Sequence, residues 1–368
     1  MASATEPGGL DSTAGSRQTG GRAWRWLDER LGIGALRYPV PAHANSLAYT
    51  LGGITMVSFV LLAVTGIYLA QFYDPTPERA HASVVYITDS AFAGELVRSL
   101  HYWLASAFVI TLVLHMVRTF ATGSFKPPRE AIWITGIVLF LLAAGLLFSG
   151  TVLKQDQEAV EALEHNKEIA DTFGFIGFWF SADFTDNVSI VTRLYIAHVS
   201  ILPLLVAVVL AIHMLLIKRH RISPLPWGDA DAVDARERDE HQKTFTSHLR
   251  HIGTWGLVLF GVVLLLSGLA PAGLGPIGVE GIEITKPPWY FLWLYPWEDW
   301  LGLRALYIIP GLLVVGLLAI PFLDRSRERD PRRRRGWMVL GLIVLAAWLA
   351  LTIYGAVTVP VSHTGMGA

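Results

Sequence analysis

The sequence contains no cysteine. A disulfide, an iron–sulfur cluster and a thioether-linked haem all need cysteine sulfur, so none of them can form on this chain. Charged residues are also scarce, at 16% of 368 residues, while 53% are hydrophobic. This balance excludes an ordinary water-soluble domain and predicts a protein that crosses a membrane several times. Residues 1–36 lack the short apolar core of a signal peptide, so we expect no cleavable leader.

Seven apolar stretches are long enough to cross a membrane as helices. They predict an all-α membrane protein with spans near 46–72, 93–120, 131–153, 192–217, 252–270, 305–323 and 336–358. A charged segment at 218–250 separates the first four spans from the last three. Residues 23–37 predict an amphipathic surface helix, or alternatively a simple interfacial linker, after a disordered tail.

Two of the apolar stretches carry a pair of histidines each. His101 and His115 are 14 residues apart, and His198 and His213 are 15 apart. Fourteen residues are close to four helical turns, so both rings of a pair leave one face, about 21 Å apart along the axis. Two such helices can clamp two planar cofactors, and haem iron between two imidazoles fits this arrangement. A lone intramembrane histidine often serves helix packing, but two matched pairs favour metal ligation.

Glycines repeat the same spacing in two other spans. Gly52 and Gly66 are 14 residues apart, as are Gly136 and Gly150. Helix packing through small residues is one explanation. Because the interval matches that of the histidines, we favour the second explanation, which is that the glycines leave room for a flat haem beside the helix.

The distribution of basic residues predicts the orientation in the membrane. With the N-terminus in the cytoplasm, 22 of the 29 Lys and Arg residues lie on the cytoplasmic side. The positive-inside rule favours this topology, with the C-terminus outside. His101 and His198 then lie near the outer surface, and His115 and His213 near the cytoplasmic surface. The predicted domains are a cytoplasmic tail and surface helix (1–45), a four-span di-haem domain (46–217), a cytoplasmic linker (218–250) and a three-span C-terminal domain (251–368).

Four stretches resemble cytochrome b of the quinol–cytochrome c oxidoreductases, the cytochrome bc complexes. They read LGGITMVSFVLLAVTG, VRSLHYWLASAFVITLVLHMVRTFATGSFKPPRE, VTRLYIAHVSILPLLVAVVLAIHMLLIKR and ITKPPWYF. The resemblance covers about residues 24–358. It is closest to the chloroplast and cyanobacterial type, joined to that type's separate small three-span subunit. The 15-residue spacing of the second histidine pair belongs to this type.

The resemblance implies roles for individual residues. The outer haem would bind His101 and His198, and the inner haem His115 and His213. Two arginines would meet haem propionates, or alternatively anchor the helix at the membrane surface. The remaining implied contacts are with quinol or quinone. The residues are Arg98 and Arg118 for the propionates, Pro287, Trp289 and Tyr290 for quinol, and His220 for the cytoplasmic quinone.

The implied function is electron transport by an oxidoreductase subunit in a bacterial plasma membrane. Quinol would be oxidised at an outer site, with one electron leaving to a Rieske iron–sulfur protein. The other would cross through two non-covalent b-type haems to a quinone on the cytoplasmic side. The acidic, aromatic loop 154–191 would form surface helices that cap the quinol site and dock the Rieske protein. The other expected partners are a c-type cytochrome subunit, membrane lipid and a second copy in a homodimeric respiratory-chain complex, with no nucleic acid.

The sequence departs from the family pattern at three places. Thr50 stands where the chloroplast type carries the cysteine of a covalent haem, and Lys154–Gln155 stands where a Pro-Trp pair is usual. Pro288 stands where the quinol motif Pro-Glu-Trp-Tyr has its carboxylate. Quinol oxidation releases two protons, and Tyr290 alone is a poor acceptor at its usual pKa near 10.

A replacement base is therefore expected near the quinol motif. The aromatic setting of Glu298 favours it as the general base. It could equally mark the start of a helical segment, and the role would then pass to Glu280, Glu283 or water.

Two other functions remain open from the sequence. A di-haem membrane anchor of another quinone-linked dehydrogenase or reductase would need the histidines but not the quinol motif. A transporter with structural histidines would show no haem spectrum.

Overall fold

The computed structural model describes residues 21–31, 34, 38–174, 177–181, 184–227 and 243–360. The predicted tail up to residue 20 and the middle of the predicted linker, 228–242, lie outside the described residues. Within the described part, seven helices are long and apolar enough to cross a membrane, as the sequence predicts. They are α2 (Leu47–Leu69), α4 (Gly94–Ala121), α5 (Glu130–Val152), the continuous helix Ile190–His220, α10 (Phe245–Leu269), α12 (Ala305–Leu323) and α13 (Arg335–Val357).

The fourth span is interrupted by one turn of different geometry. It begins as α7 (Ile190–Ile196), passes through the π-helical turn η5 (Ala197–Ile201) and continues as α8 (Leu202–His220). His198 lies inside the π-helical turn. Such turns are rare and occur most often at functional sites.

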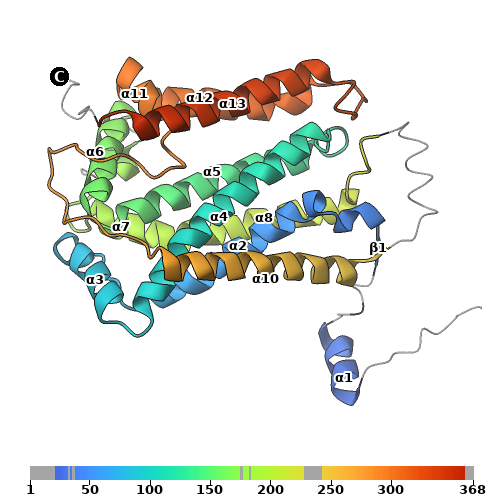
Figure 1. Ribbon diagram of the computed structural model, residues 1–368, viewed down its shortest axis with the longest axis horizontal. Coiled ribbons are helices and arrows are strands. Elements are labelled where there is room, and N and C mark those ends of the chain that lie inside the picture. The colour runs from blue at the N-terminus through green and yellow to red at the C-terminus, as the bar shows by residue number, and fades with distance from the viewer. Residues whose placement is uncertain are drawn as a thin grey trace, which may run out of the picture.

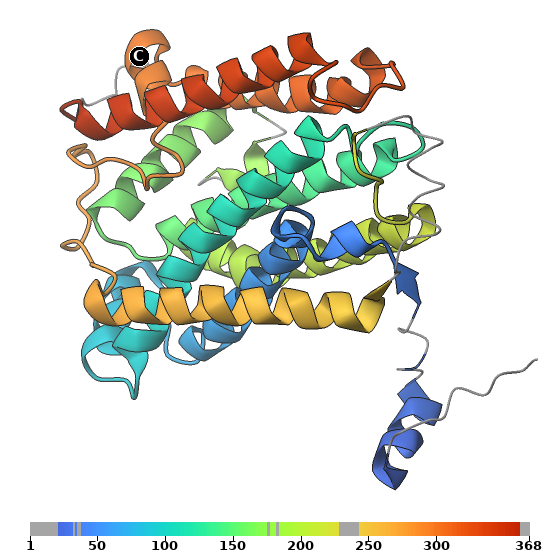
Figure 2. The same ribbon diagram turned by 45° about the vertical axis from the view of Figure 1, so that its right-hand side comes forward.

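Four of the spans form a central bundle of two helix pairs. The helix α2 packs along α4, and α5 packs along α8. Of the last three spans, α10 packs on α2 and α4, whereas α12 packs on α5. Figures 1 and 2 both show α10 on one side of the bundle and the hairpin of α12 and α13 on the other.

Shorter elements cover the ends of the bundle. The helix α6 (Gln157–Thr172) packs against α5, and α11 (Tyr295–Leu301) contacts both α12 and α13. A helix that the sequence did not predict, α3 (Pro77–Asp89), joins the first two spans and packs on α4. The remaining short helices are α1 (Arg22–Leu31), η2 (Ala42–Asn45) and η3 (Phe178–Phe180). The predicted surface helix is thus observed as α1, which extends away from the bundle (Figure 1).

Two short antiparallel strands join the segment just before the first span to the end of the predicted linker. Strand β1 (Pro39–Val40) pairs with β2 (Lys243–Thr244), and the rings of Tyr38 and Phe245 stack with centroids 4.7 Å apart. The fifth span begins at Phe245, earlier than the predicted start near 252. The difference arises because Thr244 caps this helix by accepting a hydrogen bond from Ser247 N at 3.2 Å, which lets the polar residues 245–251 join it.

The spans are apolar on the outside and carry hydroxyl groups on the inside. Large side chains such as Leu257, Leu312 and Ile353 are exposed on the outer faces. Ser58 and Ser106 are buried, and the hydroxyl of Ser58 donates to the carbonyl of Ile54 at 3.1 Å. This distribution is the reverse of a water-soluble bundle and is suited to a lipid environment, where small and polar residues mediate helix contacts.

A buried ion cluster attaches the C-terminal hairpin to the bundle. Asp324, which follows α12, contacts Lys126 Nζ at 2.8 Å and Arg334 Nη2 at 2.8 Å, and all three side chains are 2% exposed. Lys126 lies between α4 and α5, and its ammonium also donates to the carbonyl of Ser326 at 2.9 Å. Burial alone would raise the pKa of Asp324, but hydrogen bonds from Lys126 and Ser326 and the charge of Arg334 hold it below its usual value.

Replacing Asp324 should destabilise the protein strongly. Asp324→Ala leaves two buried cations without their shared anion, a loss of about 3–5 kcal/mol for a buried pair of this kind. Thermal unfolding in detergent measures the change. Glu280→Ala is the control, because its ion pair with Lys167 is on the surface, where Glu280 is 74% exposed. Equal midpoints for the two variants would contradict an anchoring role for the cluster.

Candidate haem and quinol sites

The four predicted histidines face one another in two pairs inside the bundle. His101 and His115 project from α4, His198 from η5 and His213 from α8. The rings of His101 and His198 have their centroids 6.3 Å apart. Farther along the same two spans, His115 and His213 occupy the corresponding positions towards the other end of the bundle. The structure therefore brings His101 and His198 together, as the sequence predicts, and places His115 and His213 on the same two spans.

The separation of the first pair fits a single metal atom between the rings. A metal–imidazole bond is about 2 Å long, so two imidazoles on one metal have ring centres roughly 6 Å apart. Within the described residues, no cluster of three or more His, Cys, Asp or Glu side chains could hold a bare metal ion. Two facing imidazoles suit a metal that brings its remaining ligands with it, as iron does in a haem.

Each predicted glycine faces one of the four histidines. A Cβ atom added at Gly52 would lie 2.8 Å from His115 Cε1, and one at Gly150 would lie 2.9 Å from His198 Cε1. The same construction at Gly66 reaches His101 at 3.3 Å, and at Gly136 it reaches His213 at 3.6 Å. The glycines thus leave space for the imidazole rings themselves. The sequence predicted that the glycines accommodate the haem plane. In the structure, the edge of an imidazole ring lies against each of them.

Hydroxyl groups beside three of these glycines orient three of the rings. His101 Nδ1 lies 2.9 Å from Thr65 Oγ1, His213 Nδ1 2.9 Å from Thr135 Oγ1, and His198 Nδ1 3.0 Å from Ser149 Oγ. Each hydroxyl donates its own proton to a carbonyl in its helix, such as Leu61 O for Thr65 at 2.9 Å. It therefore accepts from the ring, which assigns the proton to Nδ1 and leaves Nε2 free as a metal ligand.

The fourth histidine lacks this support. Gly52 is preceded by Leu51, which has no hydroxyl group. The Nδ1 atom of His115 is buried without a hydrogen-bond partner in the part of the chain that the structure describes. The two rings of this pair are thus held unequally, because His213 has the hydroxyl of Thr135 and His115 has no counterpart.

The two predicted propionate residues lie at opposite ends of α4. The guanidinium of Arg98 donates to the carbonyls of Ala272 and Gly273, so it also fixes the chain that follows α10. Arg118 Nε donates to the carbonyl of Ala48 at 3.1 Å, and its guanidinium lies 4.5 Å from the ring centre of Tyr49. Both contacts join α4 to its neighbours, and both arginines remain predicted ligands of propionates.

His220, the predicted quinone contact, ends α8 two turns beyond His213. Its carbonyl accepts a hydrogen bond from Arg129 Nη2 at 2.9 Å. This places it at the end of the bundle that carries His115 and His213.

The predicted quinol motif lies in the loop between α10 and α11, at the end of the bundle that carries His101 and His198. Trp289 Nε1 donates to Ser106 Oγ on α4 at 3.1 Å, and Tyr290 Oη lies 3.4 Å from Thr151 Oγ1 on α5. Burial raises the pKa of Tyr290 to about 12, with the Glu158 carboxylate acting in the same direction. A phenol with this pKa is a proton donor at neutral pH and a weak base.

The helix α6 holds this loop in place. Gln157 Nε2 donates to Ile282 O at 2.7 Å, and Gln157 Oε1 accepts from Val279 N at 2.9 Å. The carboxylate of Glu161 accepts hydrogen bonds from Ile284 N at 2.9 Å and Thr285 N at 3.0 Å. The loop thus runs along α6 and delivers the motif to the end of the bundle.

Glu298, the predicted base, is buried in an ion cluster that the sequence did not reveal. Its carboxylate lies 3.0 Å from His165 Nε2 on α6, and that nitrogen also lies 3.4 Å from Glu283 Oε1. Burial alone would lower the pKa of His165, but hydrogen bonds to Glu283 and Glu298 outweigh it and raise the pKa to about 11. His165 is therefore a cation at neutral pH.

The comparisons with known proteins bear on this geometry. The family model described as Cytochrome b/b6/petB matches residues 36–221. The chain belongs to the cytochrome b/b6 family. The matched segment contains all four histidines and all four glycines. As a family member, the chain is a multi-pass membrane protein and a cytochrome b subunit of a bc-type oxidoreductase complex.

Relatives of the b6 type match the first four spans. Cytochrome b6 of Heliobacterium mobile is 38% identical over 208 residues, which make up 54% of this chain and 98% of that protein. Cytochrome b6 of Trichodesmium erythraeum is 36% identical over 211 residues, or 55% of this chain and 94% of that protein. A solved structure named "Hyperthermophilic respiratory Complex III" has a similar fold, with a TM-score of 0.75, 23% identity and 91% of both chains covered. The whole chain is therefore consistent with a cytochrome b6 joined to the small three-span subunit.

Filling the space at Gly150 should release the haem that His198 is predicted to hold. In Gly150→Ala the new methyl group would lie 2.9 Å from the imidazole and displace it. The matched control is Gly145→Ala on the same helix, where the nearest atom, Leu202 Cδ1, is 3.5 Å away in ordinary contact. We expect about half of the b-type haem to be lost in the first variant and none in the second, as measured by reduced-minus-oxidised spectra of the purified protein. Equal haem content in both variants would contradict the assignment.

Proposed function

We propose that the chain oxidises quinol at the outer face of the membrane and carries electrons to a quinone on the cytoplasmic side. It would do so as the cytochrome b subunit of a quinol–cytochrome c oxidoreductase or of a complex with a related acceptor. The observation that carries the proposal is the facing pair of imidazoles, His101 on α4 and His198 on the fourth span, with the quinol motif packed at the same end of the bundle.

The chain's own residues would hold two non-covalent b-type haems. His101 and His198 would ligate the outer one, and His115 and His213 the inner one, each through Nε2. When bound, the haems would supply one-electron transfer across most of the roughly 30 Å hydrocarbon core. Hydrogen bonds from Nδ1 to Thr65, Thr135 and Ser149 fix the ring orientation and increase the basicity of three ligands. Thr50 offers no sulfur for a covalent haem.

The quinol motif would bind the substrate beside the outer pair. Pro287 and Trp289 shape the loop, and Tyr290, which is protonated at neutral pH, can donate a hydrogen bond to a quinol oxygen. The second quinone site would lie near His220, at the other end of the bundle. In a di-haem membrane anchor of another dehydrogenase, the packing of this motif against α4 and α5 would serve no function.

The cluster around Glu298 can take up a proton. His165 is positively charged, and the two carboxylates beside it leave a net charge of −1 when both are ionised. One more proton would neutralise the cluster at little electrostatic cost. We therefore assign Glu298 as a base for one of the two protons of quinol, with Glu283 and His165 as its partners.

The proposed complex places the chain in a bacterial plasma membrane, with the N-terminus in the cytoplasm and the C-terminus outside. Its partners would be a Rieske iron–sulfur protein, which takes one electron of each quinol, a c-type cytochrome subunit, lipid and a second copy of the chain. The acidic helix α6 and the aromatic turn η3 form the surface offered to the Rieske protein.

Removing one ligand of either pair should remove one haem. His101→Ala is expected to lose the outer haem, and His213→Ala the inner one, since a single imidazole holds the iron weakly. The control is His251→Ala, because His251 lies on α10 and contacts Trp255 of the same helix. Pyridine haemochrome assays should give about one haem per chain in the two ligand variants and two in the control. Two haems with unchanged spectra in either ligand variant would show that the ligands are elsewhere.

Glu298→Gln should slow quinol oxidation and leave both haem spectra intact. The amide keeps the shape of the side chain but accepts no proton, so turnover should fall by roughly 10- to 100-fold. Steady-state assays of the assembled complex over a range of pH measure this. The neighbouring Asp299→Asn serves as the control and should keep its turnover. An unchanged rate and pH dependence in Glu298→Gln would move the role to Glu280, Glu283 or water.

A further inference from the structure

Quinol releases two protons, and the cluster at Glu298 accounts for one acceptor. The N-terminal half of α6 and the residue before it carry three more carboxylates close to the quinol motif: Asp156, which caps the helix, Glu158 and Glu161. Their hydrogen bonds differ sharply, and this difference decides which of them can act as a base. The argument below rests on the proposed function.

Asp156 and Glu161 have both carboxylate oxygens engaged in hydrogen bonds. Asp156 caps α6 by accepting from Ala159 N at 3.1 Å, and it also accepts from Gly275 N at 3.2 Å. Glu161 accepts from Gln157 Nε2 at 3.0 Å, from two loop amides and from Thr285 Oγ1 at 2.5 Å. These hydrogen bonds hold the helix and the loop, so neither carboxylate presents an open oxygen to the quinol motif.

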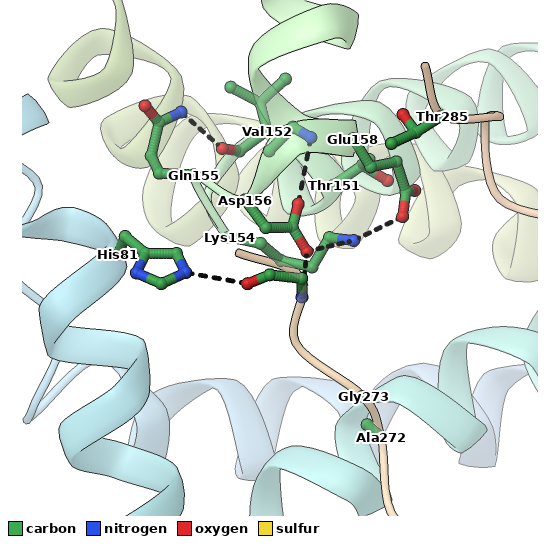
Figure 3. Close-up of polar contacts among 12 residues, drawn as sticks. His81, Thr151, Val152, Lys154, Gln155, Asp156, Glu158, Ala272, Gly273 and Thr285 are labelled. Atoms are coloured by element: carbon green, nitrogen blue, oxygen red, sulfur yellow. Dashed lines mark hydrogen bonds and ion pairs between the residues drawn. The ribbon is translucent and has the colours of Figure 1, made fainter. Parts of the chain in front are cut away.

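Glu158 is bonded on one side only. Its Oε2 accepts from Lys154 Nζ at 2.8 Å, whereas its Oε1 is buried without a hydrogen-bond partner among the described residues. Figure 3 shows Lys154 between Asp156 and Glu158, close to Thr151. Thr151 is the residue whose hydroxyl meets Tyr290 of the quinol motif. The open carboxylate oxygen thus lies at the same end of α5 as the motif.

The surroundings of Glu158 raise its pKa on balance. Burial raises its pKa, the ion pair and hydrogen bond with Lys154 oppose this, and the charges of Asp156 and Glu161 add to the increase. From the loop, Tyr290 faces it as a neutral phenol. A carboxylate in this setting takes up a proton more readily than one in water, because the neutral form is favoured by burial.

We propose that Glu158 accepts the first proton from quinol and that Lys154 positions its carboxylate. In this step one quinol O–H bond breaks and an O–H bond forms on Glu158, while one electron leaves to the oxidised iron–sulfur cluster of the Rieske partner. The proposal joins two departures from the family pattern. Pro288 removes a carboxylate from the loop, and the pair formed by Lys154 and Glu158 supplies one from the facing helix.

The geometry also separates the two acceptors in space. His165 follows Glu158 by seven residues on α6, which is two turns or about 10 Å. Glu158 would take the proton at the motif, and the cluster of His165, Glu283 and Glu298 would take the other farther along the same helix.

The test uses the intact complex and measures quinol oxidation against pH. Glu158→Gln should lower kcat by roughly 10- to 100-fold, change KM little, abolish the acidic limb of the pH profile and keep both haem spectra. Glu158→Asp should restore part of the rate. Asp171→Asn, at the exposed end of α6, is the matched control and should behave like the unmodified protein.

Lys154→Met gives a second readout that needs no change at Glu158. Lys154 opposes the rise in the pKa of Glu158, so its removal should raise that pKa and move the acidic limb to higher pH. If the complex with Glu158→Gln failed to assemble, the shift of the acidic limb in Lys154→Met would decide whether Glu158 accepts the proton. A normal rate and pH profile in both variants would overturn the role of Glu158 and leave the proposed function intact. A complex that oxidises no quinol even when unmodified would instead overturn the proposed function itself.

Discussion

The structure depends on the close approach of glycine-bearing helices to the histidine rings. Imidazole rings are bulky for a helix interface. Each ring needs a glycine on the neighbouring helix if the two helices are to stay in contact. At Gly52 and Gly150 that gap is so narrow that even a methyl group would collide with a ring. The same residues therefore fix the distance between helices, the orientation of the rings and the volume between them. The histidines and the glycines that face them thus set how closely these helices pack.

The helix α6 plays the corresponding part at the outer end. It packs on α5 and on the start of the fourth span through Leu163, and it also carries the hydrogen bonds that hold the loop between α10 and α11. Its side chains have two different roles. Gln157 and Glu161 hold backbone, whereas Glu158 and His165 are the residues that we propose for proton chemistry. One surface helix would thus combine scaffold and reactive groups.

The sequence predicted the spans, the histidine pairs and the matching glycines because these depend on periodicity within one helix. It also contained an unused local signal, since a hydroxyl residue directly precedes Gly66, Gly136 and Gly150. The cluster of Lys126, Asp324 and Arg334 could not be found in this way, because Lys126 lies 198 residues before Asp324 and none of the three belongs to a periodic pattern. The partners of His165 were hidden for the same reason. Long-range contacts between charged side chains leave no periodic trace in a single sequence.

The π-helical turn explains why the two histidine pairs have unequal spacing. A regular helix rotates by about 100° per residue, so the one extra residue in the interval from His198 to His213 would turn one ring away from α4. The turn at Ala197–Ile201 absorbs that residue as a local widening. The insertion is therefore neutral for the site, and two sequences can differ by one residue between their ligands while presenting the same pair of rings. Ligand spacing along a chain is in this sense a poorer guide to relatedness than the face on which the ligands emerge.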